Sequence, residues 1–490
     1  MIAARRTCLA EREAELGALV ELMTKSDALL VQRAPSAAWA IFDPAPCTDP
    51  SLLLAHRVAP VRRSPADAAQ LTHIKALHDT GRYREAAALA APLLDKARTR
   101  QDKNLELAAL FELAGSRIRF DAPETVAPIY EQAAQLAEAL GRDLDAAGAL
   151  WALANLNAVD LQQFGPAHQY IALARAKLER LGGGNLGVRG ELLTTEAQVF
   201  LDENRLGEAE KVMQQAVAIL EQAYGPQHPK LGAALGTLSQ ILRAQGKDSL
   251  AVSRRTFEIF QNAYGPDHPT SAGAEMNLAQ AQTNAEQYAE ARASLVHADQ
   301  VFAKVFGEVH PMRAAIAGNL AGIEQLQQHW DAALVADRRA VAILEQVQGP
   351  DTADVSGARR DTARVLALAG RLPEAIAEMH RALAILDKLG AGGESRIVSG
   401  LTELAEYELA ANQPARALPH AERAVAVAAK RPADANPAEV GDAKFALARA
   451  LWDTHRDRAR ARTLVTEANP LIDDPARRAE LDRWIAAHPE

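Results

Sequence analysis

The sequence predicts an all-α protein, a right-handed superhelical solenoid of about ten antiparallel helix pairs. The first observation behind this prediction is a recurring motif. Tyr-Gly-Pro-x-His-Pro stands at Tyr224–Pro229 and Tyr264–Pro269, with related copies at Phe306–Pro311 and Gln348–Ala353. Successive copies start 40 or 42 residues apart. A fixed period is typical of a repeat array, in which each unit packs on its neighbours.

The second observation is another recurring mark, a short turn followed by a helix that opens with Glu-Ala or Ala. It first occurs at Gly81–Ala86 and then at Asn204–Ala209, Gly246–Ala251, Glu286–Ala291, Gln328–Ala333, Gly370–Ala375 and Asn412–Ala417. Residues 81 and 204 are separated by three steps of 41, so we expect intermediate turns near residues 121 and 163. A weaker copy at His455–Arg458 completes about ten units between residues 67 and 490.

Apolar residues inside one unit follow the helical period. In the fourth unit, spacings of three and four residues connect these apolar residues: Ala209, Val212, Met213, Ala216, Ile219, Leu220 and Ala223. The Gly of each Gly-Pro-x-His-Pro motif supplies the left-handed residue that ends a helix. The second Pro fits the first turn of the next helix, where no amide donor is needed.

The N-terminal part differs from the repeats in its sequence pattern and proline content. Residues 1–33 predict an amphipathic helix, because Leu9, Leu16, Leu19, Val20 and Met23 fall mostly on one face. Residues 34–66 predict a linker, since their six prolines exclude a continuous helix. Residues 67–490 then form the repeat array and a C-terminal closing helix.

Composition excludes several classes of protein. A net charge of −9 gives no support for binding to nucleic acid or an anionic membrane. Cys8 and Cys47 lack Cys-x-x-Cys spacing, so we expect neither a metal site nor a disulfide framework, and we expect a reducing cytoplasm. Acidic residues interrupt any signal-peptide core near the start, and no apolar run is long enough to span a membrane.

Three motifs invite a chemical interpretation, and a structural role is favoured for each. Gly182–Gly187 fits G-x-G-x-x-G but follows a predicted helix, whereas a phosphate-binding loop follows a strand. His455-Arg456-Asp457 matches the kinase catalytic tripeptide but lacks the Asn five residues beyond the Asp. The periodic histidines lie in successive units, too far apart to share a metal, and are better explained as helix-end residues: His228, His268 and His310. We therefore predict no catalytic residues, cofactor or metal.

The units resemble a known family. Asn-Leu-Ala in the first helix, Gly-x-Tyr-x-Glu-Ala at the turn, and Ala then Leu in the second helix are similar to tetratricopeptide repeats. The step of 42 residues, with Tyr-Gly-x-x-His-Pro between units, resembles the kinesin-light-chain type. This resemblance covers residues 67 to about 465 and is strongest from 185 to 390. It implies a groove, lined by the first helix of each unit, that binds a protein or peptide.

The same resemblance places the family's groove residues on this sequence. Its Asn is matched by Asn277 and Asn319, and Thr237, Asp361 and Glu403 stand at the equivalent positions. One helical turn further on lie Gln240, Gln280, Arg364 and Glu406. Asn and Gln can both donate to and accept from a partner's backbone. The carboxylates make the C-terminal end acidic, which favours a basic partner; ordinary surface polarity is the alternative.

A second resemblance concerns the two ends of the chain. Residues 8–20, with the proline-rich segment after them, are similar to the part that joins a kinase domain to such repeats in bacterial serine/threonine kinases. Residues 479–488 are similar to the closing helix of those proteins. We therefore expect a non-enzymatic cytoplasmic scaffold in bacterial kinase-linked signalling. The alternative is the regulatory C-terminal part of such a kinase, and a small-molecule sensor of a transcription regulator has less support.

Overall fold

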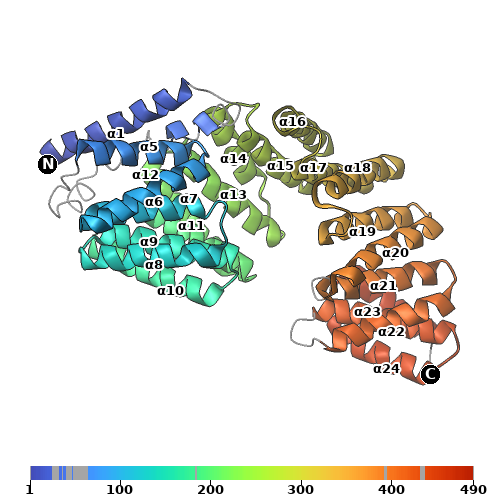
Figure 1. Cartoon of the computed structure of the whole chain (residues 1–490). Coiled ribbons are helices and arrows are strands. Elements are labelled where there is room, and N and C mark those ends of the chain that lie inside the picture. The colour runs from blue at the N-terminus through green and yellow to red at the C-terminus, as the bar shows by residue number, and fades with distance from the viewer. Residues whose placement is uncertain are drawn as a thin grey trace. The chain divides into compact units, whose positions relative to one another are not determined.

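The computed structural model describes residues 2–24, 33–35, 37–39, 47, 64–182, 185–390, 394–430 and 436–488. Every regular element in these ranges is helical, which confirms the all-α prediction. The chain divides into two compact units, unit 1 (Met1–Ala285) and unit 2 (Glu286–Glu490), coloured blue to green and yellow to red (Figure 1). No helix in the described ranges is both long enough and apolar enough to cross a bilayer. Several residues of the predicted linker and glycine motif lie outside these ranges: Pro44, Pro46, Pro50, Pro60, Gly183 and Gly184.

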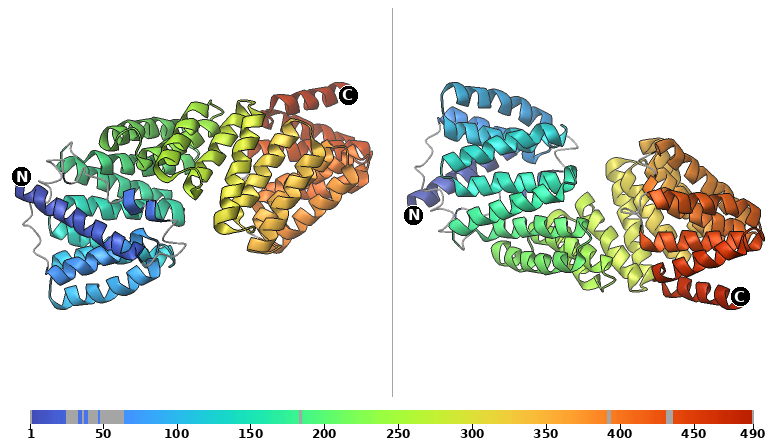
Figure 2. Two further views of the ribbon diagram at one scale, coloured as in Figure 1. Left: turned by 90° about the horizontal axis from the view of Figure 1, so that it is seen from above. Right: turned by 90° about the horizontal axis from the view of Figure 1, so that it is seen from below.

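Unit 1 consists of helix α1 (Ile2–Met23), five helix pairs and a final helix. The pairs are α5 (Pro65–Asp79) with α6 (Tyr83–Thr99), α7 (Lys103–Arg117) with α8 (Pro123–Ala139), α9 (Asp143–Asn155) with α10 (Phe164–Arg180), α11 (Leu186–Asp202) with α12 (Leu206–Tyr224), and α13 (Pro229–Ala244) with α14 (Leu250–Tyr264). A π-helical segment, η1 (Leu156–Asp160), extends α9, and α15 (Pro269–Asn284) ends the unit. Consecutive helices from α5 to α15 pack on each other (Figure 2).

Unit 2 begins with α16 (Tyr288–Phe306) and continues through four pairs. These are α17 (Pro311–Leu326) with α18 (Trp330–Gln348), α19 (Ala353–Leu368) with α20 (Leu372–Leu389), α21 (Glu394–Ala410) with α22 (Pro414–Lys430), and α23 (Pro437–Asp453) with α24 (Arg458–Ala468). A 3-10 turn, η3 (Asn469–Leu471), leads to α25 (Pro475–Ala487), whose Leu481 is buried beside Phe445. Consecutive helices from α16 to α24 again pack on each other. The succession of pairs agrees with the predicted number of repeats.

Small and medium side chains form the core of each repeat. In α12, four residues at spacings of three and four are at most 1% exposed: Ala209, Met213, Ala216 and Leu220. The 3.6-residue period predicted this stripe. Burial of a side chain such as Leu220 contributes about 1.5–3 kcal/mol, while the alanines allow neighbouring helices to approach closely.

Most turns inside the repeats contain one residue in the left-handed region, at or beside the recurring mark, and the turn between α7 and α8 contains none. These residues have φ between 52° and 83°: Gly81, Gln162, Asn204, Gly246, Glu286, Gln328, Gly370, Asn412 and His455. At Asn204 the amide of the next residue, Arg205, donates to the carbonyl of Phe200 at 2.8 Å. This bond closes a Schellman motif and satisfies a carbonyl that the end of the helix leaves unpaired.

The Gly-Pro-x-His-Pro motif ends one helix and caps the next. Its Gly has φ near 88°, and the helix that follows starts at the second Pro, as at Gly265 and Pro269. Between them, the Nδ1 atom of His268 accepts the amide of Thr270 at 3.1 Å, and its ring stacks on Tyr264. The same cap occurs at His228 and His310. The structural interpretation of these histidines is confirmed.

The His310 cap yields a stability prediction. Replacing His310 with Ala should lower the free energy of unfolding by about 1 kcal/mol, because the amide of Met312 loses its acceptor. Burial lowers the pKa of His310, so the cap contributes fully above the ordinary pKa of His and is lost as pH falls through the lowered value. Chemical denaturation at pH 8 checks the effect. His310→Asn, which restores an acceptor, should recover most of the loss; equal losses in both variants would exclude a capping role.

Helix α1 packs on α5, and only some of its apolar residues are buried. Leu19 and Leu22 are buried, whereas Leu9, Leu16 and Val20 are 51%, 42% and 52% exposed. Of the five apolar residues that the sequence places mostly on one face, Leu19 is therefore buried, while Leu9, Leu16 and Val20 face solvent. An ion pair between Glu15 and Lys75, 3.2 Å apart, supports the contact with α5.

The two cysteines form a disulfide, which corrects the expectation that they stay unpaired. Cys8 of α1 bonds Cys47, and their Cα atoms are 5.5 Å apart. Their 39-residue separation in sequence gave no sign of this pairing, because tertiary packing brings the two residues together. Disulfides persist mainly in oxidising compartments, so the bond also removes the main argument for a cytoplasmic location.

Candidate functional site

The nine predicted groove residues lie on the first helices of five consecutive repeats, and none of them is buried. We call the surface they define the first-helix face. In unit 1 it comprises Thr237 and Gln240 on α13 and Asn277 and Gln280 on α15. In unit 2 it comprises Asn319 on α17, Asp361 and Arg364 on α19, and Glu403 and Glu406 on α21. The helical repeat places the nine residues at two positions, one helical turn apart, on the first helices. Each unit therefore presents its own row of polar side chains.

In unit 1 one member of this row bonds an arginine of the neighbouring first helix. The carbonyl oxygen of Gln280 accepts a hydrogen bond from the guanidinium of Arg243, which lies one turn beyond Gln240 on α13. Burial lowers the pKa of Arg243. The hydroxyl of Thr237 donates to the carbonyl of Ala233 at 3.4 Å. A polar strip therefore runs along α13 and α15.

In unit 2 the carboxylates of the face are paired with arginines of the same chain. Asp361 and Arg364 form an ion pair at 2.8 Å, with both side chains 52% exposed. Glu403 lies 3.2 Å from Arg360. Glu406 pairs with Arg477 of α25. These arginines offset the negative charge that the sequence placed at this end of the face.

A buried carboxyl behind α19 was not predicted. Asp337 of α18 is 4% exposed, and in the described part of the chain its Oδ2 has no hydrogen-bond partner. Burial, reinforced by the charge of Asp361, raises the pKa of Asp337 to about 7, and Arg364 opposes the shift. The sequence carried a signal, because Asp337 interrupts an apolar stripe that includes Leu334 and Val341. The carboxyl therefore titrates near neutral pH beside the exposed Asp361–Arg364 pair.

The two motifs with a possible catalytic interpretation have structural roles. Gly182 has φ of 76° and lies between α10 and α11, at a turn between repeats as predicted, and Gly187 lies in the first turn of α11. His455 is the left-handed residue of the turn between α23 and α24, and the Asp457 carboxylate caps α24 by accepting the amide of Arg460 at 2.9 Å. Backbone geometry accounts for both sequences.

Two surface hollows lie on another side, lined mainly by second helices. A hollow of about 580 Å³ in unit 1 is lined chiefly by α14, including Arg254 and Glu258. One of about 360 Å³ in unit 2 lies among α18, α19 and α20. Arg359 crosses the second hollow and pairs with Glu345 and Glu378. A partner that used these hollows would leave the first-helix face open to solvent.

Part of this helical array matches a known protein family. A family model described as tetratricopeptide repeat matches residues 189–254 and 270–346. Within these residues the chain carries tetratricopeptide repeats. The matched residues span the helices from α11 into α14 and from α15 into α18, the part in which both recurring marks are clearest. A search of the curated proteins found no match.

The chain is similar in fold to solved structures at low sequence identity. The apo form of RapI is 12% identical and has a TM-score of 0.53, over 78% of this chain and 98% of RapI. The apo form of the quorum sensor NprR from B. thuringiensis is 11% identical, with a TM-score of 0.50 over 76% of this chain and 99% of NprR. A putative kinesin light chain from Podospora anserina with nearly identical TPR-like repeats is 22% identical, with a TM-score of 0.36 over 41% of this chain and 95% of that one.

Proposed function

We propose that this protein is a non-enzymatic scaffold that binds a protein or peptide segment on its first-helix face. The observation that carries the proposal is the regular placement of Thr237, Asn277 and Asn319 on the first helices of successive repeats. Gln240 and Gln280 lie one turn beyond the first two. Within one unit, hydroxyl and amide groups on neighbouring first helices can bond the regularly spaced amides and carbonyls of a bound backbone. Stacked helices hold these groups in place before binding, which reduces the entropy lost on association.

The charge of the face bears on the kind of partner. Glu403 and Glu406 are partly buried in their pairs with Arg360 and Arg477, whereas the Asp361–Arg364 pair is half exposed, so we propose that Asp361 is the carboxylate through which a basic segment would be recognised. Reversing the two partly buried pairs would disturb the fold. Exchanging Asp361 and Arg364, as in Asp361→Arg with Arg364→Asp, keeps the exposed pair and reverses its direction. A basic partner should bind this exchanged form more weakly.

We also propose that the scaffold serves bacterial kinase-linked signalling, on the basis of the sequence similarity of its two ends to repeat-containing kinases. The alternative is that the chain is the regulatory C-terminal part of such a kinase. The DNA upstream separates the two proposals. An in-frame kinase domain supports the alternative, and a ribosome-binding site directly before Met1 supports the separate scaffold.

A cytoplasmic location is part of this proposal, and the Cys8–Cys47 disulfide opposes it. Cells lysed into a thiol-alkylating reagent preserve the redox state of both cysteines for mass spectrometry. A cytoplasmic protein should carry two alkylated thiols. A protein recovered with the disulfide intact would be assigned to an oxidising compartment instead.

The binding proposal is tested by capture from native lysate with the full chain and single variants. Asn277→Ala tests the face of unit 1, and Asn319→Ala tests that of unit 2. Asn262→Ala is the matched control, because Asn262 is an exposed residue of the second helix α14 and lies off the first-helix face. We expect a partner that is retained by the control and lost or reduced by at least one of the other variants. Equal capture by all three would exclude the first-helix face as its binding site.

A further inference from the structure

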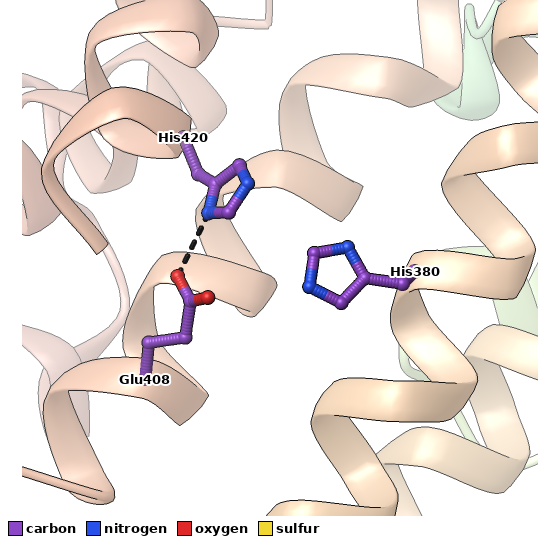
Figure 3. A group of neighbouring side chains, drawn as sticks. All are labelled: His380, Glu408 and His420. Atoms are coloured by element: carbon purple, nitrogen blue, oxygen red, sulfur yellow. Dashed lines mark hydrogen bonds and ion pairs between the residues drawn. The ribbon is translucent and has the colours of Figure 1, made fainter. Parts of the chain in front are cut away.

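A cluster of two histidines and a glutamate joins three consecutive helices in unit 2. His380 lies on α20, Glu408 near the end of α21, and His420 in the first half of α22. Their candidate ligand atoms all lie within 4.8 Å of one another. The Nδ1 atom of His420 is 2.8 Å from the Glu408 carboxylate, and the ring of His380 faces this pair (Figure 3). Three donor groups from separate helices therefore converge on one point.

The burial of Glu408 distinguishes this cluster from an ordinary surface pair. Its side chain is 1% exposed, whereas that of His420 is 27% exposed and His380 lies at the surface. Among the described residues, Glu408 forms an ion pair with His420 and with no lysine or arginine. A neutral imidazole does not cancel the charge of a carboxylate, and an uncompensated buried charge is costly.

A second buried glutamate in the same unit provides a comparison. Glu324 of α17 is 6% exposed and pairs with His329, but it also pairs with Arg292. The guanidinium supplies a permanent positive charge there. At Glu408 the group in the place of that guanidinium is a second imidazole, that of His380. A neutral imidazole can bind a metal ion. The two sites therefore differ in what can compensate the carboxylate.

From this convergence we propose that His380, Glu408 and His420 bind a divalent transition-metal ion, Zn²⁺ being the best match. Two imidazoles and one carboxylate form a donor set typical of zinc, and the remaining coordination position would take water or a group from outside the site. The surface position of His380 gives an ion a path to the buried carboxylate. The proposal is independent of partner binding on the first-helix face.

A bound ion would link two repeats. Helix α20 is the second helix of one repeat, and α21 and α22 form the next. Coordination from all three would fix their register in the native state and would add its binding free energy to the stability of this part of unit 2. The cluster does not follow the repeat, because Arg338, Leu366 and Glu378 stand 42 residues before its three members. The site therefore belongs to this pair of repeats.

To test this, the full chain is first treated with a chelator and then titrated with Zn²⁺, and calorimetry measures the binding. Wild type should bind one ion per chain, and His380→Ala should bind it at least tenfold more weakly, since even second-shell changes cost about 10–100-fold. His380 is exposed, so this variant should keep its helical circular-dichroism spectrum. His329→Ala is the matched control: it removes a histidine from the Glu324 pair and should leave Zn²⁺ affinity unchanged.

Thermal unfolding supplies a second readout. Zn²⁺ at saturating concentration should raise the melting temperature of wild type and of His329→Ala, and should have no such effect on His380→Ala. Three results would overturn the proposal: wild type shows no saturable single-site binding, His380→Ala binds as tightly as wild type, or His329→Ala weakens binding as much as His380→Ala does. Weak binding of several ions that is unchanged by His380→Ala counts as the second of these results.

Discussion

Replacing Asp299 with Ala should lower the free energy of unfolding of unit 2 by about 3 kcal/mol, because it removes the carboxylate that a buried arginine contacts with two of its nitrogens and leaves that arginine only its contacts with the exposed Glu308. The side chain of Arg313 is 6% exposed, and its Nε and Nη2 atoms contact the two oxygens of Asp299 at 2.8 and 3.0 Å. Arg339 contacts the same carboxylate at 2.7 Å. This network connects α16, α17 and α18.

The pH dependence of this network has a definite sign. Burial by itself would raise the pKa of Asp299, but hydrogen bonds from Arg313 and Arg339 outweigh burial and lower it. The carboxylate therefore stabilises the fold above its ordinary pKa, and this contribution is lost as pH falls through the lowered value. Wild type should lose stability in acid faster than Asp299→Ala does.

Denaturant unfolding of the full chain, with hydrogen exchange in α16–α18 as a local readout, measures the effect. Asp351→Ala is the control, because the Asp351–Lys388 pair is exposed and should contribute at most about 1 kcal/mol. Combining Asp299→Leu with Arg313→Met removes both buried charges and should recover much of the loss. If Asp299→Ala costs no more than the control, the buried pair does not have the role assigned to it.

The second large effect is a gain of stability. Replacing Asp337 with Asn should raise the free energy of unfolding at pH 8 by on the order of 2 kcal/mol, because the amide removes a buried charge. The native pKa of Asp337 is raised from 3.8 to about 7, so the native state holds a proton that the unfolded state has released. Wild-type stability should therefore fall as pH rises from about 4 to about 7.

Melting curves from pH 4 to pH 8 test this prediction. The difference between Asp337→Asn and wild type should be small at pH 4 and should grow toward pH 8. The exposed Asp331, on the same helix, provides the control, and Asp331→Asn should show no comparable growth. A difference that stays constant across the range would mean that Asp337 does not titrate near pH 7.

The repeat architecture was predictable because its signals are local in sequence. Left-handed turns at Asn204 and Gln328 and helix caps at His268 and His310 depend on residues a few positions apart. The apolar period of α12 likewise reports its buried stripe directly. Each of these features is set by backbone geometry within one repeat, so a single sequence shows it repeatedly.

Features that depend on distant packing could not be predicted in the same way. The buried face of α1 is decided by its contact with α5, and hydrophobic spacing alone could not show that Leu19 is buried while Leu9 and Leu16 are exposed. Glu406 suggested an acidic face, but its partner Arg477 lies on the last helix. No sequence motif links His380 with Glu408, and only the packing of their helices brings the two side chains together.

The nine residues of the first-helix face remain a prediction, and hydrogen–deuterium exchange tests it most directly. Exchange of the full chain is measured alone and with a captured partner at saturating concentration. The proposal predicts slower exchange in α13 and α15, or in α17, α19 and α21, with little change in α14, α18 and α20. Protection confined to the second helices, around the hollows of α14 and α18–α20, would contradict it and assign partner binding to the opposite set of helices.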